Sequence, residues 1–288
     1  MALCNVASAV SVQLKLAQQG SVGALIDALK DTEEIVTRYA CMALTNLSTN
    51  VDNQNRNILV EMLGLPPLVK LSFSKNVETQ RSAALALYNI SCSTANHLPL
   101  IKAEAVPALA HLGKSDDLEC KKCSTMSLAN IAANVDTRSY AVRSGGLQTA
   151  IAMVKDEDVD IRRYACIALC NMGNSPSTQE QIVVHGALPP LLKMAADHAD
   201  VESQRQALLA LSNLASNEIN HSSMLSKGLM AILTAGFASQ DLDIREYASF
   251  TIANLCSNPD YLALVGNSGG IPPLIQVCTP LISTLTCT

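Results

Sequence analysis

A single eleven-residue pattern recurs throughout this chain of 288 residues, and it restricts the fold more than any other feature. The full copies read R-Y-A-C-M-A-L-T-N-L-S at 38–48, R-S-A-A-L-A-L-Y-N-I-S at 81–91, K-C-S-T-M-S-L-A-N-I-A at 122–132, R-Y-A-C-I-A-L-C-N-M-G at 163–173, R-Q-A-L-L-A-L-S-N-L-A at 205–215 and E-Y-A-S-F-T-I-A-N-L-C at 246–256. The asparagines of these copies, together with Asn5 in the tail of another copy, follow one another at intervals of 41 to 43 residues. Self-similarity at such a period is typical of a solenoid, in which each unit packs only on its neighbours.

The composition agrees with stacked helices rather than with a globule built around aromatic residues. Hydrophobic residues make up 49% of the chain, aromatic residues only 3%, and tryptophan is absent. Small apolar side chains allow helices to approach to about 8–10 Å between axes.

Each copy of the pattern predicts an amphipathic helix, which we call the closing helix of its unit. The small residue six before the asparagine, the Leu or Ile two before it and the apolar residue one after it fall at helical spacing. The start of the helix is predicted thirteen residues before the asparagine, where residue types that mostly favour N-caps recur: Glu33, Asn76, Asp117, Asp158, Asp200 and Asp241.

A second signature precedes each closing helix and predicts a shorter helix opened by proline. It is clearest at Gly186–Leu192, Leu63–Val69, Glu104–Ala110 and Gly269–Ile275. Proline suits the first turn of a helix because its missing amide hydrogen would be unpaired there in any case. A short apolar stretch lies before each of these turns, so we expect three helices per unit. The predicted units are 10–50, 51–93, 94–134, 135–175, 176–217 and 218–258, with partial units at 1–9 and 259–288.

A three-helix unit of about 41 residues, with a G-x-[ILV]-P turn and a closing R-x-A-x-x-A-L-x-N-L helix, resembles the armadillo repeat. The resemblance covers the whole chain and implies an all-α, right-handed superhelical solenoid forming a single domain over 1–288. It also implies a non-enzymatic scaffold that binds protein partners through extended peptide segments. The sequence of the repeats is most similar to that of vacuole-membrane or general armadillo scaffolds. Nuclear-import receptors of the importin-α type carry tryptophan four residues before the groove asparagine, so the absence of tryptophan disfavours that subfamily.

By resemblance, the asparagines of the closing helices line a concave groove and contact the backbone of the bound peptide. They are Asn46, Asn89, Asn130, Asn171, Asn213 and Asn254. A carboxamide both donates and accepts hydrogen bonds, so it can pair with any peptide backbone. We expect Tyr39, Tyr164 and Tyr247, each seven residues before its asparagine, to lie on nearly the same face. The alternative is that the asparagines only join neighbouring helices.

Two charged rows accompany the asparagines. The row eleven residues before them contains Glu78, Glu119, Asp160, Glu202 and Asp243, and the row eight before contains Arg38, Arg81, Lys122, Arg163 and Arg205. From the second unit through the fifth, an acid and a base are three residues apart, so we expect pairing within one helix rather than steering of a ligand. The net charge of -5 and the lack of a basic cluster argue against nucleic-acid binding.

Ten cysteines without a secretory signal or a framework spacing favour reduced thiols and a soluble, cytoplasmic protein, with a nuclear location as a second option. The Cys120-x-x-Cys123 pair lacks a second ligand pair, and the five histidines share no repeat position in this interpretation, so we expect no metal site. We also expect no cofactor and no catalytic residues. No apolar run reaches the roughly 18 residues of a membrane span, so direct membrane insertion is not predicted.

Neither end of the chain carries a polar terminal repeat, which predicts a fragment of a longer array, an atypical gene product, or ends covered by a partner. Self-association through an uncapped end is a further option. Two alternative functions stay open. One is a structural role in cytoskeletal assembly, for example of the axoneme, through the convex and end faces. The other is an armadillo segment within a larger multidomain protein.

Overall fold

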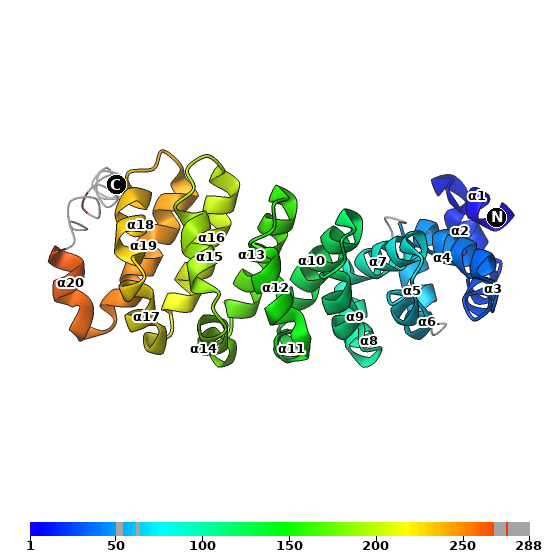
Figure 1. The fold of residues 1–288 in the computed structure, drawn as a ribbon, viewed down its shortest axis with the longest axis horizontal. Helices are drawn as coiled ribbons and strands as arrows, with labels where there is room; N and C mark the ends of the chain where they lie inside the picture. The colour runs from blue at the N-terminus through cyan, green and yellow to red at the C-terminus, as the bar shows by residue number, and fades with distance from the viewer. Residues whose placement is uncertain (50–53, 62–63, 268–274, 276–288) are drawn as a thin grey trace, which may run out of the picture. The chain divides into compact units, whose positions relative to one another are not determined.

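The computed structural model describes residues 1–49, 54–61, 64–267 and 275, and the regular structure of these residues is entirely helical (Figure 1). The contacts within the chain divide it into two compact units, residues 1–153 and residues 154–288. That both units belong to one domain over 1–288 stays a prediction. In the described part of the chain, no helix is both long and apolar enough to span a membrane.

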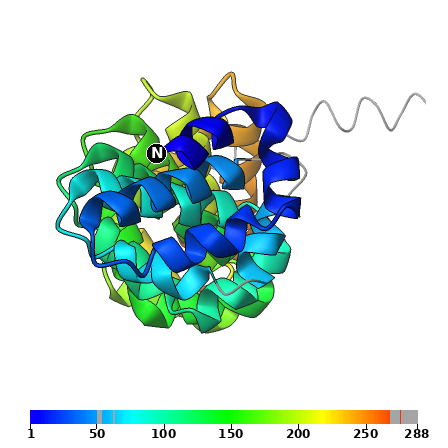
Figure 2. The same cartoon turned by 90° about the vertical axis from the view of Figure 1, so that its right-hand side faces the viewer.

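The first compact unit contains four closing helices, and each neighbouring pair of them is in contact. Its elements are α1 (Ala2–Ala7), α2 (Val10–Gln18), α3 (Ser21–Ala28), α4 (Glu34–Ser48), α5 (Gln54–Glu61), α6 (Leu65–Leu71), α7 (Val77–Ser91), η1 (Thr94–Asn96), α8 (His97–Lys102), α9 (Ala105–Leu112), α10 (Leu118–Ala133), α11 (Val135–Ala141), the π-helical turn η2 (Val142–Gly146) and α12 (Leu147–Met153). The closing helices α1, α4, α7 and α10 pack in this order. Figure 2 views the chain from the side of its N-terminus, with α1 to α3 in blue.

The second compact unit repeats the same order. Its elements are α13 (Val159–Gly173), α14 (Pro176–Val184), α15 (Leu188–Ala195), α16 (Val201–Ala215), η3 (Glu218–Asn220), α17 (His221–Ser226), α18 (Leu229–Phe237), α19 (Leu242–Cys256), η4 (Pro259–Tyr261) and α20 (Leu262–Asn267). Here α13, α16 and α19 are the closing helices, and α16 contacts both of the others. The proline turn predicted at 269–275 lies outside the described residues, apart from Ile275.

The predicted helix starts are confirmed. All six residues placed thirteen before an asparagine are N-caps, and five of them accept a backbone N–H with their side chain: Asn76, Asp117, Asp158, Asp200 and Asp241. Glu33 is the N-cap of α4 without such a bond. The paired prolines of α6 and α15 lie in the first turn of each helix. The amide hydrogen that proline lacks would have no partner within the helix at that position.

A left-handed residue precedes the second helix in five of the units. Glycine takes this conformation at Gly20, Gly145, Gly186 and Gly228, with φ between 83° and 97°. In the third unit Glu104 takes it, with φ of 57°. A residue with a Cβ pays a steric cost there, so this turn is locally strained.

The small residue six before each asparagine is buried, as expected of a position where helices approach closely. Ala40 is 3% exposed, and its counterparts Ala83, Ser124, Ala165, Ala207 and Ala248 are fully buried. The Leu or Ile two before the asparagine is also buried in all six closing helices: Leu44, Leu87, Leu128, Leu169, Leu211 and Ile252. In two of the repeats the small residue lies against the preceding helix: Ser124 Oγ donates to the Leu109 carbonyl of α9 at 2.6 Å, and a Cβ at Gly236 of α18 would come within 3.2 Å of Ala248.

The last carbonyls of the closing helices are bound by side chains of the following helix, a feature that the sequence analysis missed. A side-chain N–H from that helix donates to the carbonyl two residues after the asparagine: Gln13 to Ala7, Arg56 to Ser48, His97 to Ser91, Arg138 to Ala132, Gln179 to Gly173 and His221 to Ala215, over 2.7 to 3.0 Å. Carbonyls at a helix end lack intrahelical partners, so these bonds satisfy groups that would otherwise be unpaired.

The statement that the five histidines share no repeat position is therefore wrong for two of them. His97 and His221 each stand eight residues after an asparagine, and they are 2% and 0% exposed. Their ring nitrogens act as donors within the array.

Candidate functional site

The asparagine side chains lie between neighbouring closing helices and donate backwards along the stack. In the first compact unit, Asn46 Nδ2 donates to the Cys4 carbonyl (3.3 Å), and Asn89 Nδ2 and Asn130 Nδ2 donate to Ser48 Oγ (2.9 Å) and Ser91 Oγ (3.0 Å). In the second, Asn213 Nδ2 donates to the Cys170 carbonyl (3.3 Å) and Asn254 Nδ2 to the Ser212 carbonyl (3.1 Å). Asn171 is half-buried on α13. The amide nitrogens of these five asparagines therefore join neighbouring helices, which was the alternative left open by the sequence.

The oxygens of these same amides are not used. In Asn46, Asn89, Asn130, Asn213 and Asn254, no Oδ1 atom accepts a hydrogen bond from the described residues, and none is enclosed. Asn89 is the most buried of the five, at 7% exposure. Each side chain is therefore oriented by its nitrogen and keeps an unpaired acceptor that is not fully buried.

An open hollow of about 260 Å³ lies beside Asn46 in the first compact unit. Its lining comes from three successive closing helices: Met42, Thr45 and Asn46 on α4, Arg81, Ser82 and Leu85 on α7, and Glu119 and Cys123 on α10. Met42 and Leu85 each lie four residues before an asparagine, Ser82 lies seven before and Glu119 lies eleven before, so these positions face one hollow in the first compact unit.

The three tyrosines are not gathered with the asparagines in this hollow. The guanidinium carbon of Arg38 lies 5.3 Å from the ring centre of Tyr39, and Tyr39 lines a separate hollow between α1, α3 and α4. Tyr164 and Tyr247 are half-buried on α13 and α19, and burial raises the pKa of the Tyr247 hydroxyl. Their assignment to a peptide-binding groove stays a prediction.

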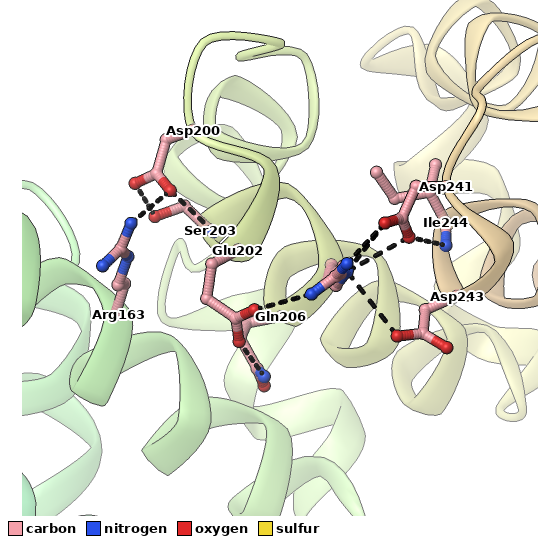
Figure 3. Close-up of polar contacts among 9 residues, drawn as sticks. Arg163, Asp200, Glu202, Ser203, Gln206, Asp241, Asp243 and Ile244 are labelled. Carbon is pink, nitrogen blue, oxygen red and sulfur yellow. Dashed lines mark hydrogen bonds and ion pairs between the residues drawn. The ribbon is translucent and has the colours of Figure 1, made fainter.

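The basic row pairs mainly between units, which corrects the expectation of pairing within one helix. Arg81 binds Asp117, Arg163 binds Asp200 and Arg205 binds Asp241, and each of these aspartates is the N-cap of the next closing helix. Arg38 binds Glu78 on α7 at 3.0 Å. The expected pair three residues apart occurs at Glu202 and Arg205, also at 3.0 Å. Figure 3 shows the contacts around Asp200, Glu202 and Asp241.

These ion pairs lower the pKa values of the capping aspartates. Hydrogen bonds from Arg81 and Arg205 hold the pKa of Asp117 and of Asp241 below the ordinary range. At Asp200, burial opposes ionisation, but hydrogen bonds from Arg163 and Ser203 outweigh it and lower the pKa to about 2. The paired carboxylates therefore neutralise the charge of all four arginines in the basic row. The exposed carboxylate of Glu119 has no ion-pair partner among the described residues.

The cysteines of the closing helices behave as packing residues. Burial raises the pKa of Cys41, Cys120 and Cys123 to about 12, so these thiols are neutral at physiological pH and are poor nucleophiles. Across residues 1–49, 54–61, 64–267 and 275, no group of three His, Cys, Asp or Glu side chains is arranged to hold a metal ion.

Comparison with known proteins agrees with this architecture. The model of the armadillo/beta-catenin-like repeat matches residues 52–92 and 175–216. No curated protein matches the chain.

Solved structures of designed proteins match the fold along most of the chain. The crystal structure of an engineered protein matches with a TM-score of 0.89 and 28% identity, over 96% of this chain and 69% of that one. A computationally designed armadillo repeat protein for modular peptide recognition matches with a TM-score of 0.76 and 22% identity, over 81% and 99%. A designed armadillo repeat protein in complex with the peptide (KR)4 matches with a TM-score of 0.67 and 28% identity, over 74% and 90%. With its three-helix units, its capped closing helices and these matches, the chain has the fold of an armadillo repeat solenoid, and two of its segments match the armadillo/beta-catenin-like repeat.

Proposed function

We propose that this protein is a non-enzymatic scaffold that binds an extended segment of a partner protein across the asparagine-bearing faces of its closing helices. Backbone N–H groups of the partner donate to the asparagine oxygens, and the side chains of the partner contact the surfaces between them. Recognition of the backbone gives affinity for extended chains in general, and the intervening surfaces give specificity.

The observation that carries this proposal is that, in the five asparagines whose contacts are described, the carboxamide nitrogen donates to a neighbouring helix while the oxygen accepts no hydrogen bond from the described residues. The nitrogen is held by the preceding closing helix, so the oxygen is fixed in place before any ligand arrives. A fixed acceptor costs less entropy on binding than a mobile one. Closing helices packed at about 8–10 Å present one such oxygen for every two to three residues of a peptide that rises about 3.3 Å per residue.

The related designed proteins support the same mode of binding. One was made for modular peptide recognition, and another was solved with a peptide. Armadillo repeats are binding scaffolds as a rule, which supports a role without catalysis.

The test must separate the oxygen of each asparagine from the helix contact made by its nitrogen. Asn89→Ala with Asn130→Ala removes both. Ser48→Ala with Ser91→Ala removes the two hydroxyl acceptors, which breaks the same helix contacts but leaves both carboxamide oxygens. Each double variant and the native chain are used to capture partners from a lysate, and their helix content is checked by circular dichroism.

We expect partners to be lost from the asparagine variant and kept by the serine variant. If both variants keep the partners of the native chain, binding does not use the asparagines. The structural role, through other faces of the chain, would then be the better account.

A further inference from the structure

We infer that the hollow between α4, α7 and α10 recognises an aliphatic side chain of the bound peptide, with lysine or arginine two residues away from it. This inference rests on the proposed function and specifies the ligand of the same surface. This is the hollow beside Asn46 described above, whose lining includes Met42 on α4 and Cys123 on α10.

The walls of the hollow suit an aliphatic group. Met42 and Leu85 face it from neighbouring helices, and Leu85 is 39% exposed in the absence of a ligand. The Cys123 thiol is neutral because burial raises its pKa. The volume of about 260 Å³ equals roughly eight or nine water molecules at ~30 Å³ each, which is enough for one large side chain. No aromatic ring lines the hollow, so it offers no surface on which a cation could stack.

The charge at the edge of the hollow favours a cation next to the aliphatic group. Two charged side chains line it, Arg81 and Glu119. The guanidinium of Arg81 is bound by Asp117, through Nε at 2.7 Å and Nη2 at 2.5 Å, so its charge is neutralised locally. Glu119 is exposed and has no ion-pair partner in the part of the chain that the structure describes. The remaining charge of the hollow is therefore negative.

The spacing of the two ligand residues follows from the positions of the walls. Met42 and Leu85 belong to the first two helices, and Glu119 belongs to the third. Side chains of an extended peptide alternate between its two faces, so residues two apart point the same way and are about 6.6 Å apart. A lysine or arginine two residues from the aliphatic group, on the side of α10, has a side chain long enough to span the remaining distance to the next helix.

The inference is tested with three fluorescein-labelled peptides, (Leu-Ser-Lys-Ser)3, (Ser-Ser-Lys-Ser)3 and (Leu-Ser-Glu-Ser)3, titrated with the full chain and followed by fluorescence anisotropy. We expect the first peptide to bind about tenfold more tightly than the second, because burial of one leucine side chain accounts for a factor of that order. It should also bind more tightly than the third, because the glutamate of that peptide is repelled by Glu119. Equal binding of the three peptides, or no binding of the first at about 1 mM, would overturn the inference.

Two variants locate the preference in the hollow. Leu85→Ser should weaken the first peptide about tenfold and leave (Ser-Ser-Lys-Ser)3 unchanged, and Glu119→Gln should weaken the first peptide about two- to fivefold. The matched controls are Val135→Ser, where the side chain is 71% exposed on α11, and Glu157→Gln, an exposed acid before α13. Control variants that weaken binding as much as Leu85→Ser and Glu119→Gln would overturn the inference.

Failure of the inference can be told apart from failure of the proposed function. If Asn89→Ala with Asn130→Ala abolishes binding that Ser48→Ala with Ser91→Ala retains, while the three peptides bind alike, only the inference fails. If the asparagine and serine variants bind (Leu-Ser-Lys-Ser)3 equally well, the proposed use of the asparagine oxygens fails.

Discussion

Asp200 performs two tasks at the start of α16, and a substitution can remove one without the other. As the N-cap it accepts the backbone N–H of Ser203 at 3.2 Å, and it also binds Nη2 of Arg163 on the preceding closing helix at 2.7 Å. Asp200→Asn keeps a capping acceptor and removes the charge, whereas Asp200→Ala removes both. Asn76, the N-cap of α7, accepts two backbone N–H groups and serves as the natural example of a neutral cap.

The size of each effect follows from burial. Loss of an N-cap costs about 1 kcal/mol. The ion pair is partly exposed, at 35% for the Arg163 side chain and 14% for the Asp200 side chain, so we assign it about 1 kcal/mol, the upper end of the range for surface pairs. We therefore expect Asp200→Ala to lower the free energy of unfolding by about 2 kcal/mol, Asp200→Asn by about 1 kcal/mol, and the control Asn76→Ala by about 1 kcal/mol.

The same pair predicts how stability depends on pH. The pKa of Asp200 falls from 3.8 to about 2 in the folded chain, against the effect of burial, because Arg163 and Ser203 bind the ionised form. The unfolded chain therefore takes up this proton at higher pH than the folded chain does. The contribution of the ion pair is complete above about pH 4 and is lost as the pH falls through about 2. Asp117 and Asp241 shift in the same direction and add to the effect.

The assay is urea unfolding followed by far-ultraviolet circular dichroism, at pH 7 and at about pH 2.5. The urea concentrations at the midpoints of unfolding are compared between variants whose transitions have the same slope. This restriction is needed because repeat proteins do not always unfold in a two-state transition. The difference between the native chain and Asp200→Asn should be largest at pH 7 and should shrink at the lower pH. The reasoning is refuted if Asp200→Asn matches the native chain at both pH values, or if Asp200→Ala is no more damaging than Asn76→Ala.

Two further predictions concern single positions whose counterparts in other units act as built-in controls. Gln179→Leu should lower the free energy of unfolding by about 1–3 kcal/mol, because the Gly173 carbonyl loses its donor, whereas Gln179→His should cost less because histidine does the same at positions 97 and 221. Equal urea midpoints for the leucine and histidine variants would contradict this. Glu104→Gly should raise stability by about 1 kcal/mol, because glycine takes the left-handed conformation without a Cβ clash. The gain is measured as a higher thermal midpoint, and Glu104→Ala, which keeps the Cβ, should show none.

The sequence predicted the parts of the fold that depend on local chemistry. An aspartate or asparagine at a helix start satisfies amides two or three residues away, so its role can be read from a short segment. The same holds for the prolines in the first turns of α6 and α15. The three-helix order of the units followed from these signals because each helix has its own start.

Contacts between units were predicted less well, because they depend on how neighbouring repeats are placed. Arg81 and Glu78 are three residues apart, which favours pairing within α7, yet Arg81 binds Asp117 and Glu78 binds Arg38. The partner in the adjacent unit is closer than a periodicity argument within one helix can reveal. A spacing of 36 residues from Arg81 to Asp117, which recurs from Arg205 to Asp241, was the available signal.

The carbonyl-binding side chains were missed for a different reason: their chemistry recurs, but their residue type does not. The position needs only an N–H donor, and glutamine, arginine and histidine all provide one. The six donors do not share one residue type, so a comparison of the repeats by residue identity does not detect this position.

This variation has a consequence for the asparagines. In the five copies whose contacts are described, their nitrogens also donate to a neighbouring helix, a task that other donors could perform, yet every copy of the pattern retains asparagine. A requirement for donation alone therefore does not account for the uniform residue type. What asparagine adds is a carbonyl oxygen on the same short, oriented group, and that oxygen is the atom left open in the five closing helices where its contacts are described. The uniformity supports a use for the acceptor, and the comparison of Asn89→Ala with Ser48→Ala measures that use directly.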